Sequence, residues 1–211
     1  MVKKTKEEAL ETRNTLLDTA EQVFYRKGVS QTTLNDIAQA AGMTRGAIYW
    51  HFKNKVDLFN AMCDRVTLPL ETMTEAATRD DVADPLGELR HSVRYFFEKV
   101  VTDQHYRLVF DILFNKCEFV AELGPIMDRD ARVRAEFRQR FERMLANAEK
   151  RGQIPRGLNH RLTAESYQAY AKGILRSWLL DPNSFDLLAD GDRMLDAFFE
   201  LLQVSKALRS S

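Results

Sequence analysis

Apolar residues recur at three- and four-residue steps along almost the whole chain, which is the period of one face of an amphipathic helix. The first segment shows the pattern with charged residues between its apolar positions, at Leu10, Leu16, Leu17, Ala20, Val23 and Phe24. Arg26, Lys27 and Gly28 then predict a helix end, because cations favour the negative end of the helix dipole and glycine tolerates the backbone that follows. No segment keeps the two-residue alternation of a strand. The pattern predicts an all-α chain of about nine helices.

Three shorter signals follow the first helix. Thr33 and Asp36 have the spacing of a capping box, which predicts a short helix to about residue 41. Gly42 interrupts this helix, and Thr44 is placed to cap the next one, which reaches about residue 51. Asn54, three residues before Asp57, predicts the start of a long helix over residues 55–78.

The remaining chain also reads as helical. Pro85 suits the first turn of a helix, and apolar residues continue at close spacing over 104–119. Pro125 opens a long segment that reaches about residue 150, where RGQIPRGL predicts a turn. Helices over about 162–180 and 187–204 complete the chain, and residues 207–211 are expected to be a frayed tail.

Residues 33–52, TLNDIAQAAGMTRGAIYWHF, have the layout of a helix-turn-helix. Ala38 is small, as the close crossing of two short helices requires, and Gly42 suits a turn with positive φ. Apolar residues stand where the helices must pack together, at Ile37, Ala41, Met43 and Ile48. The second helix of such a motif lies in the major groove of DNA.

The exposed side of the second helix carries groups suited to DNA. Arg45 can contact a guanine edge with two hydrogen bonds, and Gly46 and Ala47 allow close approach to the bases. Phosphate contacts are expected from Tyr49, His51, Lys53 and Lys55. The alternative for Trp50 and Phe52 is that they are core residues, as Ile48 and Phe52 are expected to be.

Charge distribution supports this location for DNA binding. The whole chain has no net charge, but residues 1–55 hold nine Lys and Arg against six Asp and Glu, and the remainder holds 22 against 25. The basic excess therefore lies with the motif.

Composition argues against several other classes of protein. Cys63 and Cys117 have no metal-ligand spacing with each other or with the four histidines, so we expect reduced thiols, no metal and no cofactor. No apolar run approaches the ~18 residues that span a bilayer, and the basic N-terminus has no apolar signal region, so we expect a cytoplasmic protein without a membrane partner. Nucleophile-elbow, phosphate-loop and HExxH motifs are missing, so an enzyme is not expected.

The segment TRGAIYWHFKNKVDL, with FYRKGVSQTTLNDIAQAAG just before it, resembles the N-terminal signature of the TetR family of repressors. DPLGELR, NKCEFV, RGQIP and SFDLL, which begin at residues 84, 115, 151 and 184, extend the resemblance to the multidrug-efflux branch of the AcrR and TtgR type. The resemblance implies a DNA-binding domain at residues 1–54 and a ligand-binding and dimerisation domain at residues 55–211. It also places on DNA-contacting positions of the family Thr33, Thr44, Arg45, Tyr49, His51 and Lys55.

The C-terminal half is rich in aromatic residues, which predicts an apolar ligand pocket with a few polar groups. The candidate lining residues are Phe96, Phe110, Asp111, Phe114, Cys117, Glu118, Phe137, Phe141, Tyr167, Tyr170, Ile174 and Trp178. The alternative is that most of these aromatic residues are simply core. The resemblance implies a pocket that accepts several unrelated hydrophobic compounds, such as drugs and phenolics.

A single helix-turn-helix reads few base pairs, so a dimer on a palindromic operator is expected. The last two long helices are the predicted interface, through Leu175, Trp178, Leu179, Phe198, Leu201 and Leu202. Together with the resemblance, which implies the efflux pump as the target, these features predict a dimeric repressor of a multidrug efflux pump that hydrophobic ligands release from double-stranded operator DNA. One alternative is a TetR-like regulator of a metabolic pathway that senses a metabolite such as a fatty acyl compound. Another is a helical scaffold that does not bind DNA.

Overall fold

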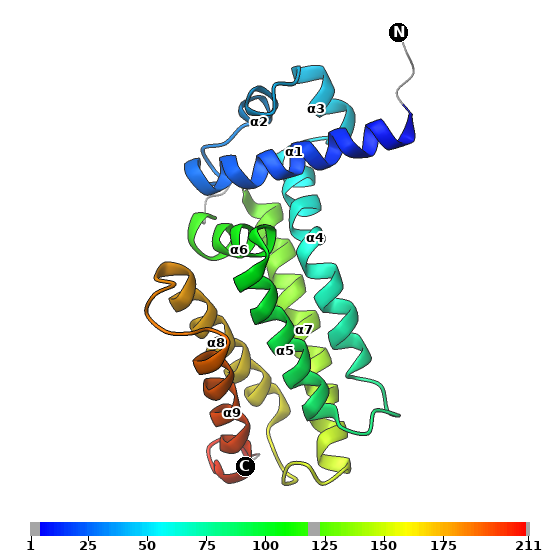
Figure 1. The fold of residues 1–211 in the computed structure, drawn as a ribbon. Coiled ribbons are helices and arrows are strands. Elements are labelled where there is room, and N and C mark those ends of the chain that lie inside the picture. The colour runs from blue at the N-terminus through cyan, green and yellow to red at the C-terminus, as the bar shows by residue number, and fades with distance from the viewer. Residues whose placement is uncertain (1–4, 118–122, 210–211) are drawn as a thin grey trace. The chain divides into compact units, whose positions relative to one another are not determined.

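The computed structural model describes residues 5–117 and 123–209, and this part of the chain is helical (Figure 1). It contains an isolated β-bridge between Leu158 and Arg209 but no β-strand. None of its helices is long and apolar enough to cross a membrane. The elements are α1 (Lys6–Lys27), α2 (Leu34–Ala40), α3 (Arg45–His51), α4 (Lys55–Ala76), α5 (Pro85–Thr102), α6 (Gln104–Asp111), the π-helix η1 (Ile112–Lys116), α7 (Gly124–Lys150), α8 (His160–Leu180) and α9 (Ala189–Val204). The all-α prediction with nine α-helices is confirmed for these residues.

The chain divides into two compact units, each built from two separate stretches of sequence. The first unit holds Met1–Thr67 and Gln104–Asp130, and the second holds Leu68–Asp103 and Ala131–Ser211. The boundary expected after residue 54 falls inside the first unit, because α6 and the first part of α4 belong with α1.

The predicted starts of three helices are confirmed by side-chain caps. Thr33 Oγ1 accepts a hydrogen bond from the Asp36 amide at 3.1 Å, and Thr44 Oγ1 accepts one from the Ala47 amide at 3.2 Å. Asn54 Oδ1 accepts from the Asp57 amide at 2.9 Å, as its spacing predicted. These side chains satisfy amides that the first turn of a helix leaves without partners.

The segment after Gln104 differs from the uninterrupted helical pattern expected to residue 119. The α-helix ends at Asp111 and continues as η1, after which Cys117 is extended at φ −101° and ψ 100°. Lys116 accepts a backbone hydrogen bond from Val29 at 3.0 Å, a tertiary contact that apolar spacing does not reveal. Phe119 lies outside the described residues.

Each unit has its own apolar core. In the first unit the rings of Phe24 and Phe59 meet edge to face at 5.9 Å, with Leu16, Leu17 and Met62 also fully buried. In the second unit aromatic rings from α7, α8 and α9 gather around the buried Tyr167.

The described part of the C-terminal tail is docked, which corrects the expectation of fraying from residue 207. Leu208 is buried, and its carbonyl accepts a hydrogen bond from the Asn159 amide at 2.8 Å. Arg209 Nη1 donates to the Pro155 and Arg156 carbonyls at 3.1 Å each. The tail thus satisfies carbonyls of the turn before α8, a pairing that the composition of the tail does not indicate.

Candidate DNA-binding surface

Helices α2 and α3 form the predicted helix-turn-helix. Gly42 has φ +66° in the turn between them, and the Met43 amide donates to the Ala38 carbonyl at 2.8 Å. Ile37, Ala38 and Ile48 are buried at the crossing. Positive φ is the conformation in which glycine has no steric penalty, so the turn depends on Gly42.

The outer side of α3 presents large polar and aromatic side chains. Arg45 and Tyr49 are both exposed, and the guanidinium carbon of Arg45 lies 5.4 Å from the centre of the Tyr49 ring. Trp50 is 71% exposed and its ring centre lies 4.5 Å from that of His51. The alternative that Trp50 is a core residue is therefore wrong, whereas Phe52 is in the core as expected.

Gly46 and Ala47 lie on the first turn of α3. A Cβ added at Gly46 would meet, among the described residues, only Thr44 Oγ1, at 3.8 Å. Packing within that part of the protein therefore does not require glycine here. A small residue on an exposed helix face is consistent with close approach of an external partner.

Thr33 and Asp36 form a charged cap at the start of α2. Asp36 accepts hydrogen bonds from the Thr33 hydroxyl at 2.7 Å and the Thr33 amide at 2.8 Å, and Lys27 Nζ lies 2.9 Å away. The Thr33 hydrogen bonds, with that of Lys27, lower the pKa of Asp36 to about 2. The Thr33 hydroxyl is engaged within this cap. The DNA contact expected of Thr33 stays a prediction.

The two lysines after α3 differ in their surroundings. Lys53 is exposed, whereas Lys55 is partly buried, and its ammonium donates to the carbonyls of Val29 and Ser30 at 2.9 and 3.0 Å. Lys55 therefore ties the start of α4 to the loop after α1. The phosphate contact expected of Lys55 stays a prediction, and the structure supplies a different role for its charge.

The predicted ligand residues are distributed over both units. The first unit contains Phe110, Asp111, Phe114 and Cys117. The rings of Phe110 and Phe114 are 6.1 Å apart, and Asp111 accepts a hydrogen bond from the Asn115 side chain at 2.7 Å. Cys117 follows η1 in extended backbone, so it does not share a helix face with the two phenylalanines.

The second unit contains the other described ligand candidates, and Tyr167 is at their centre. Its ring stacks on Phe141 at 4.5 Å and on Phe137 at 6.2 Å. Burial raises the pKa of Tyr167, and its hydroxyl has no hydrogen-bond partner among the described residues. Tyr170 is partly exposed, whereas Ile174 and Trp178 are buried. Phe96 belongs to α5 in this unit, and Glu118 lies outside the described residues.

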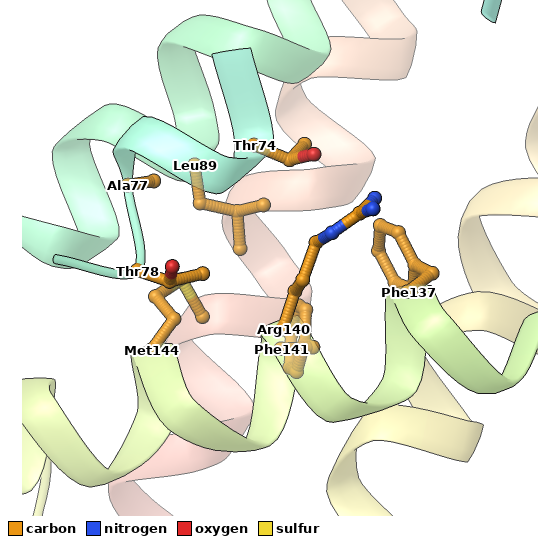
Figure 2. A pocket seen from close by; sticks show the side chains of 8 residues that line it. All are labelled: Thr74, Ala77, Thr78, Leu89, Phe137, Arg140, Phe141 and Met144. Carbon is orange, nitrogen blue, oxygen red and sulfur yellow. The ribbon is translucent and has the colours of Figure 1, made fainter. Parts of the chain in front are cut away.

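A small cavity opens beside this aromatic cluster (Figure 2). It lies among α4, α5 and α7, with space of about 10 Å³, and Leu89, Phe137, Arg140 and Phe141 are among its lining residues. A cavity of that size holds about one water molecule. A drug-sized ligand would therefore have to displace side chains to bind here.

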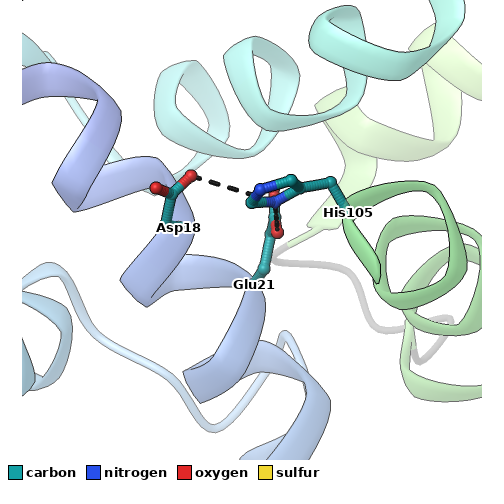
Figure 3. Close-up of side chains that lie close together, drawn as sticks. All are labelled: Asp18, Glu21 and His105. Atoms are coloured by element: carbon teal, nitrogen blue, oxygen red, sulfur yellow. Dashed lines mark hydrogen bonds and ion pairs between the residues drawn. The ribbon is translucent and has the colours of Figure 1, made fainter. Parts of the chain in front are cut away.

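The structure also assembles a polar cluster that the sequence interpretation missed (Figure 3). His105 Nδ1 on α6 lies 2.6 Å from Glu21 Oε2 and 3.9 Å from Asp18 Oδ1, both on α1. The available signal was Glu21 itself, an acidic residue between Ala20 and Val23 on the apolar face of the first helix. Its partner His105 is far along the chain, so only the fold reveals the pair.

Comparison with known proteins agrees with this geometry. Residues 16–62 match the bacterial regulatory proteins of the tetR family, and residues 84–204 match the C-terminal region of MAATS-type transcriptional repressors. The HTH-type transcriptional regulator TtgR of Pseudomonas putida is 41% identical over 209 residues, which cover 99% of this chain and 100% of TtgR.

Two solved structures are similar over nearly their whole length. NalD, the secondary repressor of the MexAB-OprM multidrug efflux pump in Pseudomonas aeruginosa, is 36% identical, with a TM-score of 0.83 over 94% of this chain and 98% of NalD. The SmeT–triclosan complex, of the repressor of the Stenotrophomonas maltophilia pump SmeDEF, is 30% identical, with a TM-score of 0.84 over 95% of this chain and 96% of SmeT. With its helix-turn-helix and these matches along both halves, the chain belongs to the TetR family of transcriptional regulators.

Proposed function

We propose that this protein represses a multidrug efflux pump by binding an operator through α3 and leaving it when a hydrophobic ligand binds. The observation that carries the proposal is the outer face of α3, where Arg45, Tyr49 and Trp50 are exposed beside the small residues Gly46 and Ala47. Large apolar and cationic side chains held in water on a short helix favour a partner that supplies both phosphates and base edges.

The proposed contacts divide by chemistry. Arg45 reads a base edge, and Thr44, at the exposed N-terminus of α3, reaches phosphate or a base edge. Gly46 and Ala47 permit the approach. Phosphate contacts come from Tyr49, His51 and Lys53, to which the exposed Trp50 indole N–H adds a donor. Lys55 holds the loop after α1, and Thr33 caps α2.

A symmetric dimer is part of the proposal, but its interface differs from the residues first expected. Leu175, Trp178, Leu179, Phe198 and Leu202 are buried within the second unit, because the aromatic cluster around Tyr167 uses the apolar faces of α8 and α9. The large apolar residues left exposed on these helices are Leu162, Tyr170, Leu180, Leu201 and Val204. We assign the dimer contact to this set, since exposed apolar patches mark association surfaces.

Ligand recognition is assigned to the aromatic residues of the second unit. The unpartnered Tyr167 hydroxyl gives this apolar cluster a hydrogen-bonding group, as ligand sites typically have. Helix α4 carries residues of both units, so a ligand that moves its second half also acts on the helix that begins beside the DNA-binding motif. With such coupling, bound ligand lowers the affinity for DNA, and bound DNA lowers the affinity for the ligand by the same factor.

Efflux control is favoured over a metabolic role. The relatives NalD and SmeT, both at least 30% identical, are named as repressors of multidrug pumps, and SmeT was solved with triclosan. No observation on this chain favours a fatty acyl ligand. A repressor of this kind acts on chromosomal DNA and is therefore expected in the cytoplasm.

The test is binding of the purified protein to DNA that flanks its own gene. Footprinting should reveal one palindromic site, and titration with triclosan should release the protein from it. Arg193→Ala, at an exposed arginine of α9, is the matched control for loss of DNA binding in Arg45→Ala. Failure to protect any flanking sequence, with the protein folded and dimeric, would remove the local-repressor proposal.

A further inference from the structure

The cluster of Asp18, Glu21 and His105 lines an open cleft of about 380 Å³ within the first unit. Helix α1 supplies the two carboxylates and the start of α6 supplies the imidazole, as Figure 3 shows. One ligand atom from each residue lies within 4.8 Å of the other two. Ligand atoms bound to one metal ion at about 2.0–2.2 Å lie ~3–3.5 Å from one another. Small side-chain rotations would therefore bring the three ligand atoms of this cluster to metal-binding distances.

One carboxylate oxygen of Glu21 is buried without a hydrogen bond from the described residues. The residue is only 1% exposed, and its Oε1 has no hydrogen-bond partner among the described residues. Arg65 Nη1 forms an ion pair with that oxygen at 3.5 Å, and the same nitrogen donates to Asp18 Oδ1 at 2.6 Å. A buried carboxylate oxygen without a donor is costly, and a metal ion that binds it removes this cost.

Charge balance permits a dication. Asp18 and Glu21 carry two negative charges when ionised, and Arg65 contributes one positive charge, so the cluster is negative with a neutral imidazole. Arg65 engages Asp18 through Oδ1, the oxygen that faces His105, so an ion would bind Asp18 through Oδ2 or share Oδ1 with Arg65. Glu21 is among the residues that line the cleft. His105 Nδ1 and Glu21 Oε2 lie 2.6 Å apart in a hydrogen bond. Metal binding at Nδ1 would replace that hydrogen bond, with any proton on Nδ1 passing to solvent and the neutral ring keeping its proton on Nε2.

We propose that Asp18, Glu21 and His105 form a binding site for a first-row transition-metal dication, with Zn²⁺ as the expected ion. An imidazole with two carboxylates suits zinc and its neighbours, and the remaining positions are filled by water. Calcium and magnesium favour sites built of oxygen atoms, so the histidine selects against them. The site links α1 to α6, so occupancy stabilises the unit that carries the DNA-binding motif.

The experiment uses tag-free, chelator-treated full-length protein titrated with Zn²⁺ by calorimetry, with Mg²⁺ as the competing probe. One ion per chain should bind, raise the melting temperature and resist millimolar Mg²⁺. Removing a residue that only hydrogen-bonds to a metal ligand typically weakens metal binding by ~10–100-fold. His105→Ala and Glu21→Gln each remove a ligand itself, so each should weaken Zn²⁺ binding by at least that much. His91→Ala, at an exposed histidine on α5 of the second unit, should bind like the parent protein.

Cobalt separates this site from the partly exposed Cys117. Co²⁺ at the cluster should give visible d–d absorption without the near-ultraviolet thiolate band that sulfur ligation produces. A crystal soaked in Zn²⁺ should show anomalous density within bonding distance of His105 Nδ1. This observation on the parent protein stands even where a variant does not fold.

The proposal would be overturned by no Zn²⁺ binding to the parent protein, by a thiolate–cobalt band, or by zinc density away from His105. Unchanged affinity in folded His105→Ala would do the same. None of these outcomes bears on operator binding or drug release, which are measured without metal.

Discussion

Arg45 and Tyr49 contact each other on the outer face of α3, yet both remain exposed for binding to DNA. Their contact at 5.4 Å holds the guanidinium over an aromatic ring, while both side chains stay in solvent. A cation–π contact of this exposed kind is worth only ~0.5–1 kcal/mol. It can therefore orient Arg45 before binding and yield readily to a base edge.

Replacing Arg45 tests base readout directly. Arg45→Ala should cost about 1–3 kcal/mol of specific affinity and relax the preference at one operator position per half-site. Fluorescence anisotropy against single-base operator variants measures both effects, with Arg193→Ala as control. If discrimination is unchanged at every position, Arg45 reads no base.

Asp36 makes a stability contribution that depends on pH. Its pKa falls from 3.8 to about 2 in the folded protein, chiefly through the hydrogen bonds of Thr33. A lowered carboxyl pKa stabilises the fold above the unfolded value and loses that effect as pH falls through the folded value. Asp36→Asn should reduce the free energy of unfolding by ~1 kcal/mol near pH 7, as loss of a helix cap does.

The difference between Asp36→Asn and the parent protein should shrink as pH falls from about 4 towards 2. Denaturant unfolding at a series of pH values measures it. A difference that stays constant over this range would show that the charge of Asp36 does not contribute.

At the scale of elements, the start of α4 is held by a tertiary contact as well as by its own cap. Lys55 donates to two carbonyls of the loop after α1, and Asn54 caps the first turn. The motif is therefore fastened to α1 on its C-terminal side. Lys53, two residues earlier and exposed, has no such contact described.

The pair Lys55→Met and Lys53→Met separates fold stabilisation from phosphate contact. Lys55→Met should lower the free energy of unfolding by ~1–3 kcal/mol, because the two carbonyls lose a charged donor. It should leave the salt dependence of DNA affinity unchanged. Lys53→Met should keep stability within ~0.5 kcal/mol and make the salt dependence shallower by about one counterion per half-site. A shallower slope in Lys55→Met would restore the phosphate contact first expected of it.

At the scale of the whole molecule, the exposed apolar residues of α8 and α9 test assembly. Leu201 is 46% exposed and Val204 is 75% exposed, so a charge at either position costs the isolated subunit little. Leu201→Glu with Val204→Lys should yield folded monomer by analytical ultracentrifugation and weaken operator binding by at least tenfold. Leu68→Glu, at a similarly exposed leucine of α4, is the control and should remain dimeric. A dimeric double variant would place the interface elsewhere.

Drug release should obey reciprocity in the intact protein. Saturating operator should weaken triclosan binding by the same factor by which triclosan weakens operator binding, because both ligands share one coupling free energy. Calorimetry with and without operator measures one side of this cycle and anisotropy measures the other. Equal drug affinity in both states would exclude ligand-controlled release.

The sequence alone determined the helical architecture and the DNA-binding motif, because both depend on contacts close along the chain. Caps at Thr33, Thr44 and Asn54 act within four residues, and the positive φ at Gly42 is a local steric preference. The outward residues of α3 follow from helical period once the core positions Ile37 and Ile48 are assigned. Arg45 and Tyr49 are therefore exposed on α3, as the pattern predicted.

Tertiary structure decided how apolar and charged residues are shared between core and surface. Trp50 and Trp178 both lie in helical segments, yet Trp50 on α3 is exposed and Trp178 on α8 is buried. The difference arises because the side of α8 that carries Trp178 is covered by the rest of its unit, whereas the side of α3 that carries Trp50 is not. The change to a π-helix after Asp111, the engagement of Lys55 and the meeting of Glu21 with His105 each involve partners distant in sequence. Periodicity reports which face of a helix is apolar, but which residues meet there is set by the packing of the folded chain.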